Sequence, residues 1–456
     1  MSRPKQRKGG RVTPKGTGSN NGPVISSGPG RQSLPSSGLG SGPFGASAGG
    51  FDDPFGGALS GPLGSTWDDE YDEGDPDVLS LAGDAIASGH PAELLVLAST
   101  FAEAVADAGR RRPLIAEVDP DDPDAEISWD VIVDDFVNVT RPETTAILHA
   151  LIPFAPPEVG AVLARELAGR STPGLPEWIS SIGDAEVTDV WVRSALLGDD
   201  DDWFLGVRWP TGQQLTFVVH ADHHAGGMVQ DVFLAPMAFE QMLELITGDG
   251  EGTVDQRPVD PADARMVLER AVQRWEMTYP PSLTDDWPIM RPMLLWLLST
   301  LPEGGSDPDR KFVDDDTRNG LVDSFLASSF GEPVRDDPDT PMLVESILWY
   351  GCDYGVGDPL RWSELRVEML LLDFFPRKVV VEEAFLVKLP AVLSAFVAFA
   401  MQQLGEREGL SSQLVATLSG QVLETIDEIT PEYFELIADG ADAVDDEPGP
   451  TVAPRS

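Results

Sequence analysis

Cysteine is nearly absent from this chain, since Cys352 is the only one among 456 residues. A single cysteine cannot form an intrachain disulfide, which excludes the disulfide-stapled folds of small secreted proteins. The basic first residues lead directly into glycine, serine and proline, without the apolar segment of a signal peptide. We therefore expect a cytoplasmic protein.

Long hydrophobic runs are also missing. The two most apolar stretches, residues 292–301 and 389–401, are shorter than the roughly 18 residues that a membrane-spanning helix needs. The sequence therefore predicts a protein without a membrane partner.

Positive charge is scarce and unevenly placed. The chain has 31 Lys and Arg residues against 77 Asp and Glu residues, a net charge of −46. Residues 1–50 contain seven basic residues and no acidic one, so the other 406 residues carry 24 basic and 77 acidic side chains. Such an acidic body repels phosphate backbones and anionic lipids. Binding to nucleic acid, if it occurs, is therefore expected through residues 1–15 alone.

Familiar catalytic signatures are absent as well. The sequence contains no Walker A loop, no Rossmann glycine fingerprint, no GxSxG nucleophile elbow and no HExxH zinc motif. We therefore expect no cofactor. These absences favour a binding protein over an enzyme.

The composition divides the chain into five parts. Residues 1–66 are rich in glycine, serine and proline and have almost no periodic apolar positions, so they cannot bury enough surface to offset the entropy of ordering. The expected parts are a disordered tail (1–77), a helical block (78–183), an antiparallel meander with a helix (184–250), a helical domain (251–441) and a disordered acidic and proline-rich tail (442–456). The predicted fold class is α+β: mainly α-helical, with a small antiparallel β-meander near the middle and a disordered N-terminal tail.

Segments rich in Val, Trp and Phe predict the strands of the meander, at 186–197, 203–209 and 213–221. Asp199–Asp202 and Pro210–Gly212 are the predicted hairpin links. The four aspartates are therefore interpreted as a solvated hairpin tip. A fourth, edge strand is expected within 229–236.

Most remaining segments carry helical signals. The clearest helix is expected to start at Pro261, where Asp260 can cap it, and to carry an apolar stripe up to Trp275. The segment 390–407 is apolar almost all round, which predicts a central buried helix. Other helices are expected near 288–301, 315–329, 340–351, 363–375, 411–427 and 431–438.

The stretch HADHHAGG at 220–227 holds three of the five histidines beside an aspartate. His220 is expected at the end of a strand, with Asp222 and His223 in the turn beyond it. These three side chains are the catalytic candidates, and Asp222, His223 and Asp231 are the candidate ligands of a divalent ion. The competing interpretation is a plain turn, in which Asp222 and the two glycines shape the backbone and the histidines bond locally.

The letters DHH at 222–224 resemble the signature of DHH-type phosphoesterases, in which Asp and His hold a catalytic metal at a strand end. The resemblance implies a metal-dependent hydrolase centred on HADHH. It covers three residues, and the other acidic motifs and the parallel sheet of that family are not recognisable here. Because closed metal sites need three or four ligands, we expect no bound metal.

A second candidate site lies within 351–380, where basic residues gather in an otherwise acidic body. The candidate binding residues are Arg377, Lys378, Arg361, Arg366, Asp353 and Asp358. In the structural interpretation, Arg361 pairs with Asp353 or Asp358. Arg377 and Lys378 then meet helix carbonyls or Asp373. This interpretation is favoured over a ligand site, because ion-pair networks are common outside functional sites.

The stretches DYGVGDPLRWSELRVEMLLLDFFPRKV and DHHAGGMVQDVFLAP resemble segments of uncharacterised acidic actinobacterial cytoplasmic proteins of similar size. The resemblance covers roughly residues 185–440 and implies no activity. With the absent catalytic signatures, it favours a non-catalytic protein that binds another macromolecule, in the first place a protein. A metal-dependent hydrolase and a nucleic-acid-associated protein acting through residues 1–15 remain the alternatives.

We predict that removing residues 1–66 leaves a stable folded body, because this segment lacks the apolar periodicity that packing needs. Limited proteolysis of the full chain should trim this segment first. The truncated protein should unfold at the same temperature as the full chain. A midpoint lower by many degrees after truncation would show that the segment packs on the fold.

Overall fold

The computed structural model describes residues 77–111, 127–171, 174–247, 252–278, 284, 286–306, 313–378 and 383–445. The predicted N-terminal tail, apart from its last residue, lies outside the described residues. The predicted C-terminal tail overlaps the last helix, which ends at Asp445, and its remainder lies outside them. The described chain is mainly helical with one five-stranded antiparallel sheet in its middle, which confirms the predicted α+β class.

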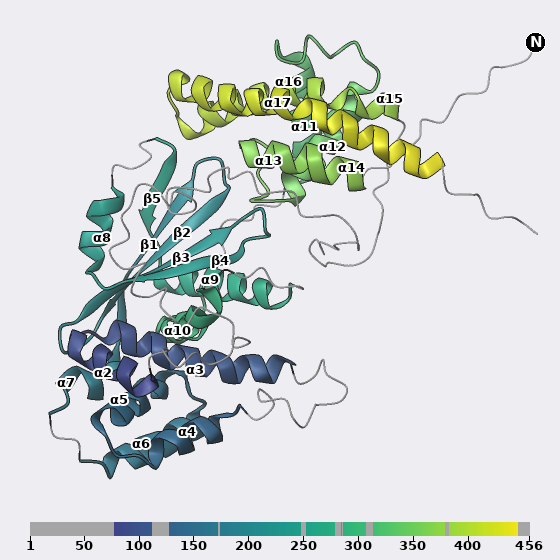
Figure 1. Cartoon of the computed structure of the whole chain (residues 1–456). Helices are drawn as coiled ribbons and strands as arrows, with labels where there is room; N and C mark the ends of the chain where they lie inside the picture. Colours follow the sequence, from purple (N-terminus) through teal and green to yellow (C-terminus); the bar gives the residue numbers. More distant parts are fainter. Residues whose placement is uncertain are drawn as a thin grey trace, which may run out of the picture.

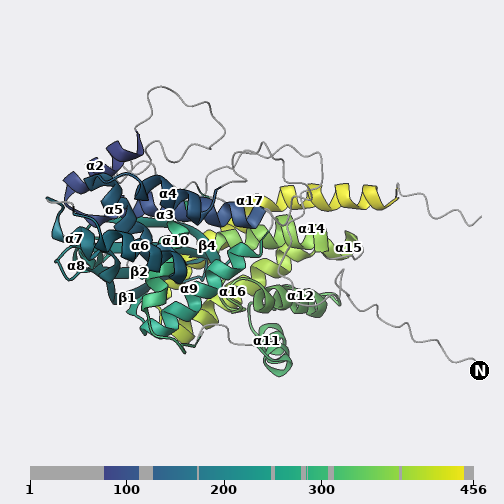
Figure 2. The same ribbon diagram turned by 90° about the horizontal axis from the view of Figure 1, so that it is seen from below.

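Two units make up the described chain (Figure 1). The sheet unit contains the sheet and the helices of residues 77–306, and the helical unit contains the helices of residues 313–445. Each unit has a large apolar core of its own. The helical unit lies beyond one end of the sheet, and Figure 2 shows both units from below.

The elements of the sheet unit are α2 (Val78–Ser88), α3 (Pro91–Arg111), α4 (Trp129–Val137), α5 (Pro142–Leu151), η3 (Ile152–Phe154), α6 (Pro157–Ala168), α7 (Glu177–Ser180), η4 (Ile182–Asp184), β1 (Glu186–Ala195), β2 (Asp200–Arg208), β3 (Gln214–Asp222), β4 (Met228–Ala235), α8 (Phe239–Ile246), β5 (Val254–Pro258), α9 (Pro261–Glu276) and α10 (Trp287–Thr300). Those of the helical unit are α11 (Asp315–Ala327), α12 (Thr340–Asp353), α13 (Glu364–Glu368), the π-helix η5 (Met369–Phe374), α14 (Phe375–Lys378), α15 (Glu383–Leu386), α16 (Leu389–Glu408) and α17 (Ser412–Asp445).

The sheet has the strand order β4-β3-β2-β1-β5 with antiparallel pairing throughout. Strands β1 to β4 form the predicted meander, and β4 is the expected fourth, edge strand. The sequence does not predict β5, whose five residues VDQRP pair with β1 at the other edge. This strand has one β-branched residue and ends in proline, so tertiary pairing rather than local propensity makes it a strand.

Different helices cover the two faces of the sheet. Leu215, Phe217 and Val219 of β3 lie in the large core on the face that packs against α9 and α10. Phe204 and Val218 belong to the opposite face and pack under α8. Figure 1 accordingly shows α8 and α9 on opposite sides of the sheet.

Helix α9 begins as predicted. Asp260 caps it by accepting a hydrogen bond from the Ala262 amide at 2.9 Å, and Pro261 occupies the first turn. Its buried stripe belongs to the core of the sheet unit and consists of Ala264, Leu268, Ala271, Val272 and Trp275. Because α9 and α10 pack on the sheet and not on the later helices, the packing differs from the predicted division near residue 250.

Helix α16 is the predicted central buried helix. It packs against α12 and α17, and the ring of Phe396 contacts the rings of Phe325 and Trp362. The segment Ala384–Glu408 is long and apolar enough to cross a membrane, although the sequence predicts a shorter apolar run. Most of its apolar window is buried inside the helical unit, so core packing accounts for its composition.

Helix α17 differs from the two helices that the sequence predicts. It runs without a break from Ser412 to Asp445, with Pro431 inside it. Proline removes one backbone donor and usually bends or ends a helix. Here Ile426 and Tyr433, one on each side of the proline, are both fully buried in the core of the helical unit, and this packing holds the two halves together.

Candidate functional site

The aspartate run and the histidine stretch face each other across the β2–β3 hairpin. Its register places Asp202 opposite His220 and Asp200 opposite Asp222. The predicted solvated hairpin tip is therefore wrong, because Asp200, Asp201 and Asp202 belong to β2. Only 8% of Asp201 and 6% of Asp202 are exposed. The strand carries these carboxylates into the fold instead of out to solvent.

Each histidine of the stretch contacts its own aspartate. The pairs, with their N···O distances, are His220–Asp202 (2.9 Å), His223–Asp201 (3.0 Å) and His224–Asp199 (2.6 Å). His220 uses Nδ1 for this contact, and the other two histidines use Nε2. A carboxylate buried without a partner is costly, so the pairs explain how this run can be buried.

The turn between β3 and β4 positions the histidines. Asp222 Oδ1 accepts hydrogen bonds from the amides of His224 at 2.7 Å and Ala225 at 3.2 Å. Gly226 and Gly227 have φ angles of +81° and +72°, a left-handed conformation that glycine adopts without strain. Asp222 is the last residue of β3 and not, as the sequence predicted, a residue of the turn, but its side chain and the two glycines shape the turn in the way that the turn interpretation expects.

Charge and burial shift the pKa values of this cluster. Burial alone would lower the pKa of His220, but the hydrogen bond and the negative charge of Asp202 outweigh it, and the pKa is raised. The pKa of His223 is raised in the same way by Asp201. Burial raises the pKa of Asp200 to about 6, and neighbouring carboxylates add to this shift while His220 opposes it. The carboxylates therefore favour the protonated forms of His220 and His223, and burial favours the protonated form of Asp200.

The candidate ligands of the predicted metal chemistry do not converge on one point. Among the described residues, no group of three or more His, Cys, Asp or Glu side chains is arranged to hold a metal ion. The three candidates have separate partners: the turn amides for Asp222, the Asp201 carboxylate for His223, and the Val232 amide with the Thr284 hydroxyl for Asp231. The described part of the chain thus offers the hydrolase hypothesis no supporting geometry.

A serine of the helical unit joins the cluster. The Ser363 hydroxyl donates to Asp199 Oδ1, the same oxygen that His224 contacts. In a catalytic triad the histidine lies between the acid and the hydroxyl, where it can take the hydroxyl proton. Here the acid lies between the other two side chains. This order binds Ser363 to the sheet unit and does not activate it as a nucleophile.

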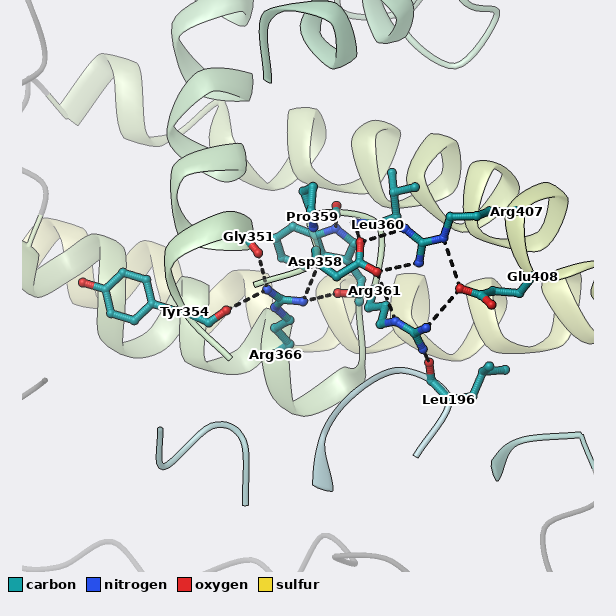
Figure 3. A network of polar contacts seen from close by, with 11 residues as sticks. Leu196, Gly351, Tyr354, Asp358, Pro359, Leu360, Arg361, Arg366, Arg407 and Glu408 are labelled. Carbon is teal, nitrogen blue, oxygen red and sulfur yellow. Dashed lines mark hydrogen bonds and ion pairs between the residues drawn. The ribbon is translucent and has the colours of Figure 1, made fainter. Parts of the chain in front are cut away.

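The second candidate site is organised around a buried arginine (Figure 3). Arg366 is 1% exposed and donates to four backbone carbonyls, those of Gly351, Tyr354, Asp358 and Arg361. Its guanidinium carbon also lies 5.2 Å from the centre of the Trp362 ring. Burial lowers the pKa of Arg366, although arginine stays charged at neutral pH. Arg366 therefore holds the loop before α13 in shape and does not face solvent.

An ion-pair network lies beside this loop (Figure 3). Asp358 contacts Arg361 at 3.1 Å and also contacts Arg407, which confirms one of the two predicted partners of Arg361. Glu408 contacts both arginines at 3.1 Å. Arg361 also donates to the carbonyl oxygen of Leu196, in the turn between β1 and β2. The network therefore reaches from the helical unit to the sheet unit.

The remaining candidates of the second site have other partners. These partners are Asp373 for Arg377, the hydroxyl and ring of Tyr354 for Lys378, and Arg318 for Asp353. The pairing of Arg377 with Asp373 is confirmed, whereas the contact of Lys378 with a phenol is not predicted by the sequence. The basic residues of 351–380 therefore do not form one binding pocket.

Sequence reasoning did not identify several residues that complete the two sites, namely Asp199, Asp201, Asp202, Ser363, Arg407 and Glu408. One of these residues, Asp202, could have been found from the sequence. Counting outward along both strands from the hairpin link at 210–212 brings Asp202 opposite His220. The link between Asp199 and Ser363 spans 164 positions, and no local pattern encodes it.

Comparison with known proteins assigns the chain to no family. No family model, no curated protein and no solved structure matches it. Its function therefore has to be inferred from the residues described above.

We predict that replacing both His220→Gln and His223→Gln flattens the pH dependence of stability. A histidine whose pKa is raised on folding contributes stability that is complete below its ordinary pKa near 6.5 and is lost as the pH rises through the raised value. Denaturant unfolding from about pH 6 to about pH 8.5 should therefore show a falling stability in the parent and a smaller fall in the variant.

His149→Gln is the matched control for this experiment. Burial lowers the pKa of His149, so the stability linked to it is lost as the pH falls through about 6.5, the opposite direction. This variant should therefore keep the fall in stability toward alkaline pH. A parent whose stability is constant across the whole range would contradict the prediction.

We also predict that Arg366→Met destabilises the helical unit by about 3–5 kcal/mol, because it leaves buried carbonyl groups without donors. The control is Arg335→Met, in which an exposed arginine of the same unit loses its bonds to the Leu326 and Ser328 carbonyls. Water can replace those bonds, so the control should lose much less stability. Equal losses in the two variants would show that Arg366 does not organise the loop.

Proposed function

We propose that this protein is a non-catalytic binding protein whose partner is a basic protein or peptide, held on the acidic face of α17. The observation that carries the proposal is the composition of α17, which contains eight acidic residues and no Lys, Arg or His. Five exposed members of this set, Glu424, Asp427, Glu428, Glu432 and Glu435, form what we call the acidic stripe.

The spacing of the acidic stripe supports one continuous surface. Glu424, Glu428, Glu432 and Glu435 follow one another at intervals of three or four residues, and Asp427 lies three residues after Glu424, so the five share one side of the helix over three turns. Like charges at this spacing destabilise a helix by a few tenths of a kcal/mol per pair. A positively charged partner would remove this repulsion. The stripe is therefore better suited to a complex than to an isolated helix.

Cations of the helical unit do not neutralise the stripe. Residues 313–445 contain 26 acidic and eight basic side chains. Each of the eight is already bonded to another group in the described structure: Arg318, Arg335, Arg361, Arg366, Arg377, Lys378, Lys388 and Arg407. Within the described residues, none of the ion pairs found includes a member of the stripe.

The neighbouring helix α13 extends this acidic surface. Burial raises the pKa of Glu368, and the charges of Glu364 and Glu432 raise it further, which reports the local negative field. Leu365 and Phe434 are 44% and 40% exposed on the same two helices. Oppositely charged surfaces speed association and favour the correct partner, while apolar groups beside them add contact area.

The test uses a lysine- and arginine-rich peptide as the probe and removes four charges from the stripe. In the stripe variant Glu424, Glu428, Glu432 and Glu435 are all changed to Gln. In the control variant the same number of charges is removed from exposed positions of α4 and α6: Asp130→Asn, Asp134→Asn, Glu158→Gln and Glu166→Gln. We expect the parent to bind more weakly as salt is added.

The stripe variant should bind the peptide about tenfold more weakly than the parent, a change of about 1.4 kcal/mol. The control variant should stay within about threefold of the parent, because distant charges are screened at physiological salt. If both variants lose peptide affinity to the same extent, the binding depends only on the net charge of the protein, and the proposal is wrong. Binding of DNA that depends on residues 1–15 would instead support a nucleic-acid-associated protein.

A further inference from the structure

The sheet unit touches the helical unit through its turns and loops, and no closely packed pair of helices or strands joins the two described units. The chain passes from one unit to the other once, after α10 and before α11. Hydrogen bonds between the units are made at the turn of residues 196–199 and the loop of residues 356–363, which together we call the junction. Gly252, before β5, also lies near α17, since a Cβ atom there would be 3.4 Å from Cδ2 of Leu414.

One side of the junction is a close apolar fit. Leu196 and Leu197 are partly buried against the core of the helical unit. Gly198 has a φ angle of +82°, and a Cβ atom there would lie 2.8 Å from Cγ2 of Val356. The side chain of Val356 can approach the backbone of the turn this closely because position 198 has no side chain. Leu196 and Leu197 are the two apolar side chains of the described sheet unit that pack against the core of the helical unit.

The other side of the junction is polar and converges on Asp199. Its Oδ1 atom accepts from Ser363 of the helical unit and contacts His224 of the sheet unit. Beside it, Arg361 donates to the Leu196 carbonyl. Water can replace such hydrogen bonds at a net cost of about 1–3 kcal/mol each, which is far less than the cost of opening an apolar core. Small polar interfaces between domains permit relative motion.

We propose that the sheet unit and the helical unit are two hinged bodies, and that Asp199 is the latch that closes them. Opening breaks the bonds that Asp199 and Leu196 receive from the helical unit and exposes both partners to water. The pair of Asp199 with His224 survives, because both residues belong to the sheet unit. Arg366 keeps the opposing loop in shape in both states, since all four of its carbonyl partners lie within the helical unit.

The test compares hydrogen exchange and X-ray scattering of the full chain, Asp199→Ala and Asp200→Ala. Asp200 is the matched control, because it is the adjacent carboxylate and no bond from it to the helical unit is found in the described structure. In Asp199→Ala, exchange at residues 196–199 and 356–363 should be about tenfold faster or more, the factor expected for losing a hydrogen bond to a charged group. The radius of gyration should increase. Asp200→Ala should behave like the parent in both measurements.

Hydrogen exchange of the unmodified protein tests the hinge independently, in case Asp199→Ala does not fold. In the parent, the two segments of the junction should exchange together and faster than the β2–β3 ladder and α16, whose amides open only with their own units. Junction amides that exchange as slowly as these core amides would show one rigid body and refute the hinge. An Asp199→Ala protein that folds with unchanged exchange and scattering would refute Asp199 as the latch.

Discussion

Hydrogen bonds between three aspartates (Asp199, Asp201 and Asp202) and the three histidines at and just beyond the end of β3 hold together the hairpin end that faces the helical unit. The hairpin register carries Asp201 and Asp202 into the fold, where a charged carboxylate needs a partner, and Asp199 lies just before the strand. Three imidazoles provide those partners, one for each of three carboxylates. This requirement explains why so much of the chain's histidine lies in one short stretch. It also explains why these histidines contact acids singly instead of gathering around a common ligand.

Scarce positive charge has a related consequence in the helical unit. Its basic side chains are committed to internal partners, and the most buried of them, Arg366, binds four backbone carbonyls and no carboxylate. The acids that remain, above all those of α17, define the outer surface. The excess of acidic over basic residues therefore has two results: the basic side chains are bonded inside the unit, and acidic side chains remain exposed. This surface charge is the physical basis of the proposed basic partner.

The two candidate sites of the sequence, residues 220–227 and 351–380, meet at the boundary between the units. Asp199 connects them, because it contacts His224 on one side and Ser363 on the other. Polar residues of these two regions thus form hydrogen bonds at the junction as well as inside each unit. The sheet unit meets the helical unit through turns and loops, while each unit has a separate apolar core.

Local pattern in the sequence determined the fold class, the meander, the cap of α9 and the buried character of α16, because alternation, capping and apolar stripes act over a few residues. It also determined that the side chain of Asp222 and the following glycines shape a turn. The tertiary structure alone decided that the aspartates at 200–202 are strand rather than hairpin tip, and that VDQRP pairs as an edge strand. It alone joined Asp199 to Ser363 and gave Arg366 its four carbonyl partners. These outcomes depend on long-range packing, in which burial forces polar groups to find partners that no neighbouring residue supplies.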